Sequence, residues 1–355
     1  MPTQSSQQNA SKPCLGDKVY IPAFDFALPT KQHPDAEIME RRVVKDIWPY
    51  IFSHFKSEAA AKAYAAQRCP SFSTFAYPNT LKDRIYLVMQ AADVITLMDE
   101  EFTNQKVRDD ASRRMTLRGH YLHAIDGVRP PDTVPIAQLL FDHLQAILAT
   151  LASRPGVRNC LINAIRDQIN TLTDASVNNV PTLTFEQYVA WRRIDGFGEW
   201  LATLTEYALD VDMSAALNES SALREIRTAS IDSVTLVNDL MSFRKEFGSQ
   251  DATNGLWALM REHDLNLQQA ILCLVDRCRE NEKKLIDARN CLLATPLGQR
   301  ADVIRYMTEL EHLHTGNAEW SSYTTRFHGL DFHGRFTSGE ITIDPVLLPQ
   351  HIANQ

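Results

Sequence analysis

The sequence predicts an all-α protein, built as one helical bundle in a single domain. Apolar residues recur with helical spacing along most of the 355 residues, and alternation with a period of two is confined to the run ITIDPVL near the C-terminus. Gly accounts for only 13 residues, well below the usual share of about 7%. We therefore expect few tight turns and long helices separated by Pro-containing loops.

The N-terminal region differs in composition from the rest. Residues 1–35 contain many Gln, Ser and Pro residues and predict a flexible arm, in which Ile21, Phe24, Phe26 and Leu28 can pack on the body as an extended strap. A helical domain is expected from there on, over residues 36–355, with Asp35 opening the first helix. The strongest helical patterns cover residues 81–105, 136–151, 185–209, 222–247, 266–293 and 302–313.

Composition and charge exclude several classes of protein. The formal net charge is −8 and no basic run is present, which argues against a nucleic-acid partner. No apolar stretch reaches the ~18 residues of a membrane span, and the polar N-terminus lacks the apolar core of a secretory signal. The six Cys residues form no C-x-x-C pair, which indicates reduced thiols. We expect a soluble cytoplasmic protein, monomeric or homodimeric, in which an anionic ligand requires bound cations or a locally basic pocket.

The first candidate site lies in the segment LVNDLMSFRKEF. Asn238, Ser242 and Glu246 occur at four-residue intervals, so a helix places them on one face. Their amide, hydroxyl and carboxylate oxygens form a ligand set suited to a hard cation such as Mg²⁺. Asp239 and Lys245 flank this face, and the Lys245 ammonium can hold an anionic group bridged to the metal. A polar stripe on a solvated helix is the alternative interpretation.

The second candidate site is acidic. In TLMDEEFTN, Asp99, Glu100 and Glu101 directly follow a thoroughly apolar helical run. Adjacent carboxylates at the end of a buried element repel one another unless cations neutralise them. A helix terminus that simply meets water is the competing explanation.

Two further segments carry arginine. In WRRIDGFGEW, Arg192 lies one turn before Asp195 and Gly196, where a guanidinium can grip a phosphate and a glycine invites a kink with exposed carbonyls. Pairing of Arg192 with a neighbouring carboxylate is the structural alternative. In NAEWSSYTTRFHG, Trp320 precedes Arg326 by six residues. Taken alone, such a Trp is typical of packing and such an Arg is typical of the surface.

Together these segments resemble the class I terpene synthases of bacteria and fungi. That family carries an Asp-rich D-D-x-x-D/E motif, an arginine pyrophosphate sensor, an N-D-x-x-S-x-x-x-E motif and an Arg-Tyr pair near the C-terminus. Here Asn238 follows Arg192 by 46 residues and Asp99 by 139, which matches the family's order and spacing. The resemblance covers residues 93–327 and includes the Trp six residues before the terminal Arg.

The sequence departs from the family pattern at three positions. Glu100 replaces the second Asp of the Asp-rich motif, and Thr103 stands at its fifth position, which leaves Glu100 or Glu101 to assist Asp99. Phe327 stands where the family has the Tyr of the terminal pair.

The resemblance implies a Mg²⁺-dependent carbon–oxygen lyase that binds three metal ions. Asp99, assisted by Glu100, would bind two of them, and Asn238, Ser242 and Glu246 would bind the third. These metals would neutralise the diphosphate of the substrate and stabilise it as a leaving group.

The resemblance also implies roles for the basic residues and for the kink. Arg192, Lys245 and Arg326 would clamp the diphosphate, and closure of the site would exclude water. Arg192, Asp195 and Gly196 match the family's sensor, linker and effector positions, where the effector is a backbone carbonyl at a helix break.

The expected substrate is farnesyl diphosphate, and the expected product is a cyclic sesquiterpene hydrocarbon or alcohol. A carbocation needs aromatic walls, for which Trp320 is the first candidate, followed by Phe75 and Phe197, whose alternative role is core packing. Thr96 can orient a water that would yield an alcohol. The alternatives are a diterpene cyclase that uses geranylgeranyl diphosphate, a non-catalytic helical bundle that binds a prenyl diphosphate or a partner protein, and a purely structural scaffold.

Overall fold

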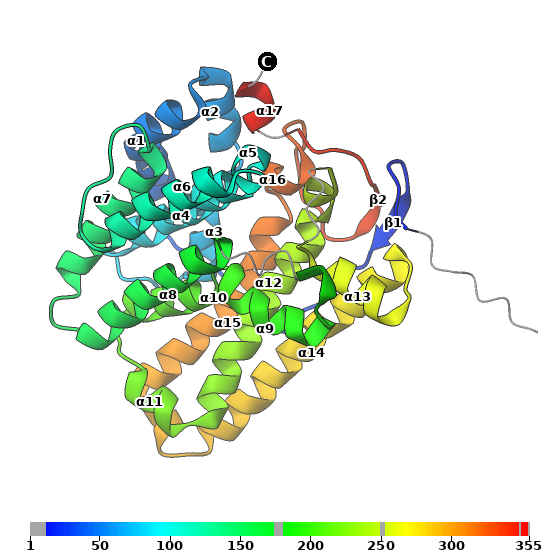
Figure 1. Ribbon diagram of the computed structural model, residues 1–355. Coiled ribbons are helices and arrows are strands. Elements are labelled where there is room, and N and C mark those ends of the chain that lie inside the picture. The colour runs from blue at the N-terminus through cyan, green and yellow to red at the C-terminus, as the bar shows by residue number, and fades with distance from the viewer. Residues whose placement is uncertain (1–11, 174–179, 249–252, 348, 354–355) are drawn as a thin grey trace, which may run out of the picture.

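The computed structural model describes residues 12–173, 180–248, 253–347 and 349–353, and these residues form a helical bundle with one small sheet (Figure 1). The two strands are β1 (Lys18–Ile21) and β2 (Gly339–Thr342). The helices that surround the site are α3 (Cys69–Ala76), α4 (Ile85–Thr103), α5 (Gln105–Arg108), α6 (Ala111–Ile125), α8 (Pro155–Thr173), α9 (Phe185–Asp195), α10 (Gly198–Leu209), α12 (Ser221–Gly248), α15 (Ala301–Ser321) and α16 (Thr325–His328). The others are α1 (Ala36–Phe55), α2 (Glu58–Ala65), α7 (Pro135–Thr150), α11 (Ser214–Glu219), α13 (Gly255–His263), α14 (Leu267–Leu293), the 3₁₀ turn η2 (Leu297–Gln299) and α17 (Pro349–Ala353). The predicted all-α fold class is confirmed.

Helix α12 is the central element of the bundle, with α14 and α15 packed beside it (Figure 1). Polar side chains fix its crossing with α15: Ser230 Oγ donates to the Leu310 carbonyl at 2.7 Å, and Asn317 Nδ2 donates to the Val234 carbonyl at 2.8 Å. Each bond satisfies a group that would otherwise be buried without a partner. These contacts hold the two helices that carry Asn238 and Trp320 in a defined register.

Helix α15 extends beyond the predicted range of 302–313. It continues to Ser321, and at Gly316 it crosses α3 so closely that an added Cβ would lie 2.4 Å from the Phe75 carbonyl carbon. The glycine therefore does not end the helix; it permits the close approach of another backbone.

Capping residues set the starts of two helices. Asn266 and Gln269 form a capping box at the start of α14, as Thr184 and Gln187 do at the start of α9. Each box satisfies two backbone N–H groups that the first helical turn leaves without partners.

The predicted flexible arm over residues 1–35 is wrong in part, because its second half is packed on the bundle. Strand β1 pairs antiparallel with β2, with Lys18 opposite Thr342. Ile21 and Leu28 are buried, and Glu282 of α14 accepts hydrogen bonds from the backbone N–H groups of Ala27 and Leu28 at 2.9 Å each. This is the predicted extended strap. Residues 1–11 lie outside the described residues.

The helical pattern predicted over residues 185–209 is broken into α9 and α10. The break falls at Gly196 and Phe197, where glycine was expected to cause a kink. Within the part of the chain that the structure describes, no helix combines the length and apolar character needed to cross a membrane.

Candidate active site

A cavity of about 800 Å³ opens between α4, the α9–α10 break, α12, α15 and α16. The predicted site residues come together around it, although they are spread over more than 200 positions of the chain. Ser242 is buried on α12 and is the one member of the predicted set outside the lining. The members that line the cavity are Asp99, Glu100, Arg192, Asp195, Gly196, Asn238, Lys245, Glu246, Trp320 and Arg326.

The acidic end of α4 faces Arg326 of α16. The Arg326 guanidinium donates to Glu100 Oε1 through Nη1 and to Asp99 Oδ2 through Nη2, the latter at 3.3 Å. Although burial opposes its charge, these two carboxylates keep the pKa of Arg326 above its ordinary value. The replacement of Asp by Glu at position 100 therefore preserves a carboxylate at the cavity.

Glu101 also lines the cavity but has partners other than Arg326. It accepts a hydrogen bond from Tyr121 Oη at 2.5 Å and lies 3.3 Å from His54 Nδ1. Thr103 donates to the Asp99 carbonyl at 2.7 Å, so the residue at the fifth motif position supports the helix end. Of the two acids expected to assist Asp99, Glu100 is the one beside Arg326.

On α12, Asn238, Ser242 and Glu246 lie along one face, as their spacing predicts. Ser242 Oγ is buried and has no hydrogen-bond partner among the described residues. Asn254, which caps α13, donates to Glu246 Oε2 at 2.7 Å and to the Asp239 carbonyl at 2.6 Å. Asn254 was missed as a site residue, although an Asn directly before an apolar helical run is the usual signal of an N-cap.

Arg192 connects α9 to α12. Its Nε donates to Asp239 Oδ1 at 3.0 Å, its Nη1 to Asp195 Oδ2 at 2.6 Å and its Nη2 to Asn238 Oδ1 at 3.2 Å. The neighbouring carboxylates, above all Asp239, outweigh the effect of burial and raise the pKa of Arg192. Arg192 therefore pairs with neighbouring carboxylates, as the structural alternative predicts, and it also lines the cavity.

Asp239 is the fully buried partner that orients this arginine. Its carboxylate also accepts hydrogen bonds from Tyr188 Oη at 2.6 Å and from the Gly255 N–H at 2.9 Å. Burial raises the pKa of Asp239, and the charge of Arg192 opposes that rise. The sequence placed Asp239 beside the metal motif, but Tyr188 comes from another helix and carried no signal of its own.

The break between α9 and α10 brings backbone to the cavity wall. Phe197 adopts a left-handed conformation with φ of 61°, and Gly196 lines the cavity. An added Cβ at Gly196 would lie 2.6 Å from Thr235 Cγ2 and 2.8 Å from the Arg192 carbonyl oxygen. Only glycine fits at this approach to α12.

Lys245 places a third cationic side chain at the same end of the cavity. Burial, together with the positive charge of Arg326, lowers the pKa of Lys245, while the nearby acids Asp99, Glu246 and Glu100 oppose that shift. The polar end of the cavity thus combines cations with oxygen ligands.

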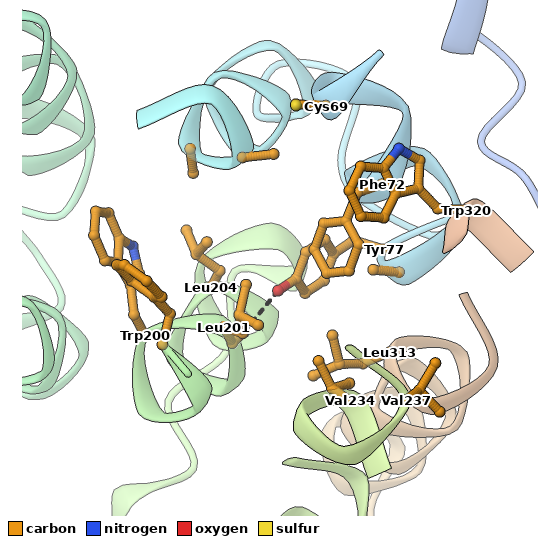
Figure 2. Packing of buried hydrophobic residues seen from close by; sticks show 14 of the residues in the cluster. Cys69, Phe72, Tyr77, Trp200, Leu201, Leu204, Val234, Val237, Leu313 and Trp320 are labelled. Carbon is orange, nitrogen blue, oxygen red and sulfur yellow. Dashed lines mark hydrogen bonds between the residues drawn. The ribbon is translucent and has the colours of Figure 1, made fainter. Parts of the chain in front are cut away.

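Another part of the cavity wall is apolar and aromatic. Phe72 and Trp320 meet edge to face with centroids 5.8 Å apart, and Leu201 and Val234 complete the wall (Figure 2). Figure 2 also shows Tyr77 donating to the Leu201 carbonyl, a bond of 2.9 Å that fixes α10 against α3.

Two of the three predicted aromatic residues line the cavity, Trp320 and Phe197. Phe75 lies outside the lining, within the part of the chain that is described, and instead meets Tyr323 with centroids 6.0 Å apart. Core packing, the role that the sequence favours for Phe75 over a place in the wall, agrees with these contacts. Phe72 and Phe75 both belong to α3, but the ring of Phe72 packs on Trp320 and that of Phe75 packs on Tyr323.

The oxygen donors of the polar end fit a hard divalent cation. Ser242 Oγ and Glu100 Oε2 are buried oxygens without hydrogen-bond partners among the described residues, which fits a role as metal ligands. The described residues contain no cluster of three or more His, Cys, Asp or Glu side chains that could hold a metal. The candidate ligands are instead divided between α4 and α12 and include an amide and a hydroxyl.

Comparison with known proteins gives the family. The model of terpene synthase family 2, C-terminal metal binding, matches residues 90–284. The Microbial Terpene synthase-like protein 13 of Selaginella moellendorffii is 26% identical over 310 residues, which cover 84% of each chain. The (3S,6E)-nerolidol synthase of the same organism is 22% identical over 333 residues, which cover 90% of this chain and 86% of that one.

A solved structure shows the same fold. Aristolochene synthase from Penicillium roqueforti superposes with a TM-score of 0.69 at 19% identity, over 84% of this chain and 98% of the other. The family model spans the acidic end of α4, the α9–α10 break and the whole metal face of α12. The chain therefore belongs to the metal-binding terpene synthase family 2 and is a class I terpene synthase, a lyase or cyclase that acts on a prenyl diphosphate.

Proposed function

We propose that this enzyme is a Mg²⁺-dependent sesquiterpene cyclase that uses farnesyl diphosphate. The observation that carries the proposal is that charged side chains and an aromatic, apolar wall line one cavity of about 800 Å³. A prenyl diphosphate has the same combination, with a charged head and a long apolar tail. The relatives named as a nerolidol synthase and an aristolochene synthase are named for fifteen-carbon products, which supports the farnesyl substrate.

Asp99 and Glu100 of α4, together with Asn238, Ser242 and Glu246 of α12, would hold the metal ions, three in all. Bound Mg²⁺ would neutralise the diphosphate and stabilise it as a leaving group. The protein's own contribution is to hold the two ligand sets on rigid helices that face each other across the cavity.

Arg192, Lys245 and Arg326 would grip the diphosphate oxygens. The carbon–oxygen bond at the allylic carbon breaks, the diphosphate leaves with the electron pair, and an allylic cation remains. Arg192 is joined to Asp195 directly before the helix break, so its movement toward the diphosphate would be transmitted to the Gly196 carbonyl, whose dipole can stabilise the positive charge.

The aromatic end would guide the cation into a ring and keep water away from it. The faces of Phe72, Phe197 and Trp320 offer negative π density to a carbocation without acting as nucleophiles. Loss of a proton from the cyclised cation gives a hydrocarbon, whereas addition of one water and loss of its proton gives an alcohol. Thr96 lines the cavity one turn before Asp99 and is our candidate to orient such a water.

Incubation with geranyl, farnesyl and geranylgeranyl diphosphates, followed by gas chromatography–mass spectrometry, tests this function. We expect a cyclic C15 product from farnesyl diphosphate as the main product. A cyclic C20 product in excess would replace this proposal with a diterpene cyclase. Three intact substrates at saturating Mg²⁺ would contradict it and favour a bundle that only binds prenyl diphosphates.

A further inference from the structure

The α9 helix ends at Asp195, and one side chain of α8 bonds to backbone groups on both sides of the break between α9 and α10. Gln168 Nε2 donates to the Asp195 carbonyl at 2.6 Å, and its Oε1 accepts from the Phe197 N–H at 3.1 Å. The Phe197 N–H is shared with the Ile194 carbonyl at 3.0 Å. Gln168 is only 1% exposed and belongs to a helix that packs against both α9 and α10 (Figure 1).

The two bonds of Gln168 enclose Gly196, since its partners are the residues directly before and after that glycine. In a continuous helix the Asp195 carbonyl would accept from the backbone N–H of residue 199. The Gln168 amide takes the place of that bond, so the interrupted conformation leaves this carbonyl satisfied although it is buried. No other side chain among the described residues bonds to both sides of the break.

The conformation that Gln168 holds is strained. Phe197 has φ of 61° and ψ of 15°, a left-handed conformation that is unfavourable for a residue with a side chain. Such strain persists only where the surroundings over-determine it, and it concentrates at functional sites. Packing of Phe197 on Trp200, with centroids 6.1 Å apart, and the bond to Gln168 are the restraints at this residue.

We infer that Gln168 is a positioning residue that fixes the direction of the Gly196 carbonyl at the cavity. This inference rests on the proposed function of that carbonyl. Arg192 restrains the break from the cavity side through the Asp195 carboxylate, at 2.6 Å, whereas Gln168 restrains it from the α8 side through the Asp195 backbone. When Arg192 moves toward a diphosphate, the Gly196 peptide would then turn while Gln168 holds the Asp195 carbonyl and the Phe197 N–H in place.

Two substitutions of Gln168 distinguish a positioning role of its amide from a role in packing alone. Gln168→Leu keeps the approximate size and removes both bonds. Gln168→Glu keeps the acceptor for the Phe197 N–H, but its ionised form has no donor for the Asp195 carbonyl. When protonated, the introduced carboxyl regains that donor, so its activity relative to wild type should rise as the pH falls. Gln138→Leu is the matched control, because Gln138 is also buried and its amide donates to a backbone carbonyl, that of Pro130, at 3.0 Å.

We expect Gln168→Leu to lower kcat for cyclic product about 10- to 100-fold, as for a misplaced catalytic group, with KM changed less than about threefold. Hydrogen exchange over residues 193–199 should accelerate in this variant and remain as in wild type in Gln138→Leu. The Gln168→Glu activity, divided by that of wild type at each pH, should increase toward acid.

Wild-type kcat in Gln168→Leu, or a Gln168→Glu profile parallel to that of wild type, would overturn the inference. If Gln168→Leu does not fold, the near-isosteric Gln168→Glu decides the question through its pH profile. A wild-type enzyme without cyclic product contradicts the proposed function alone, because the exchange measurement still shows whether Gln168 holds the break.

Discussion

Arg326 of α16 and Glu100 of α4 form a buried ion pair in the lining of the cavity, although 226 positions separate them in the chain. The same guanidinium reaches Asp99, so one cation joins two adjacent acids. Removing one partner of a buried pair leaves an uncompensated charge. This pair therefore connects a proposed diphosphate ligand to a proposed metal ligand.

We expect Arg326→Gln to reduce kcat/KM about 10²- to 10³-fold, because it removes a charge that stabilises the leaving diphosphate. Steady-state kinetics with farnesyl diphosphate measure this. Arg335→Gln is the control, since Arg335 is exposed and pairs with Glu319 at the surface. Equal effects of the two substitutions would show that the pair with Glu100 has no special role.

Two serines of α12 offer a matched test of the metal face. Ser242 and Ser233 are both buried, and the hydroxyl of each has no hydrogen-bond partner among the described residues, but only Ser242 lies between Asn238 and Glu246. We expect Ser242→Ala to raise the Mg²⁺ concentration for half-maximal activity about tenfold or more, as loss of a ligand should. Ser233→Ala should leave it unchanged. A shift of the same size in both variants would contradict this assignment.

The aromatic wall can be tested by the products. Trp320→Leu and Trp320→Phe both remove the bond from Trp320 Nε1 to the Arg68 carbonyl, 3.0 Å long, but only the Phe variant keeps a π face. We expect the Leu variant to release mainly acyclic or early-quenched products and the Phe variant to retain most of the cyclic product, because π density stabilises the cation. Identical product profiles of the two variants would argue that Trp320 only fills space.

Asp93 makes the stability of the protein depend on pH. It is buried beneath the acidic end of α4 and accepts a hydrogen bond from Tyr64 Oη at 2.9 Å, and burial raises its pKa to about 8. Between about pH 4 and pH 8 the native state therefore holds a proton that the unfolded chain has lost, and the contribution of Asp93 to stability falls as the pH rises. The fall ends near pH 8, where the native group also ionises.

The Asn side chain of Asp93→Asn does not titrate. The free energy of unfolding of this variant, minus that of wild type, should therefore increase by about 1.4 kcal/mol per pH unit between pH 5 and pH 7. Urea denaturation of both proteins at several pH values measures this slope. Asp302→Asn is the control: the bond with Arg300 lowers the pKa of Asp302, so this variant should differ from wild type by a constant amount above pH 5. A constant difference for Asp93→Asn as well would contradict the raised pKa.

The sequence predicted the site best where the residues concerned lie on a single helix. Asn238, Ser242 and Glu246 share a face because 3.6-residue periodicity fixes their relation on α12. The helix breaks at Gly196, as expected, although Gly196 itself has φ of −83° and the left-handed residue is Phe197. The separation of Arg192 from Asn238 matched a family pattern, and the structure joins the two residues at 3.2 Å.

Relations between helices could not be read in the same way. Gln168 and Asn254 act on the site through bonds to residues 27 and 8 positions away, and nothing in their local pattern specifies those partners. Phe72 and Phe75 lie in a segment bounded by Pro70 and Pro78, too short for its period to show which ring faces the cavity. The strap at Ile21 and Leu28 was recognised by its apolar residues, whereas its anchor, Glu282, lies more than 250 positions away.

The most direct test of the central claim is the rate of diphosphate release from farnesyl diphosphate as Mg²⁺ is titrated, with the organic products quantified in the same samples. We expect no release without Mg²⁺, a saturable rise as the metal is added, and one cyclic C15 molecule for each diphosphate released. Release that is independent of Mg²⁺, or substrate that stays intact at saturating Mg²⁺, would contradict the assignment of this cavity as a metal-dependent cyclase site.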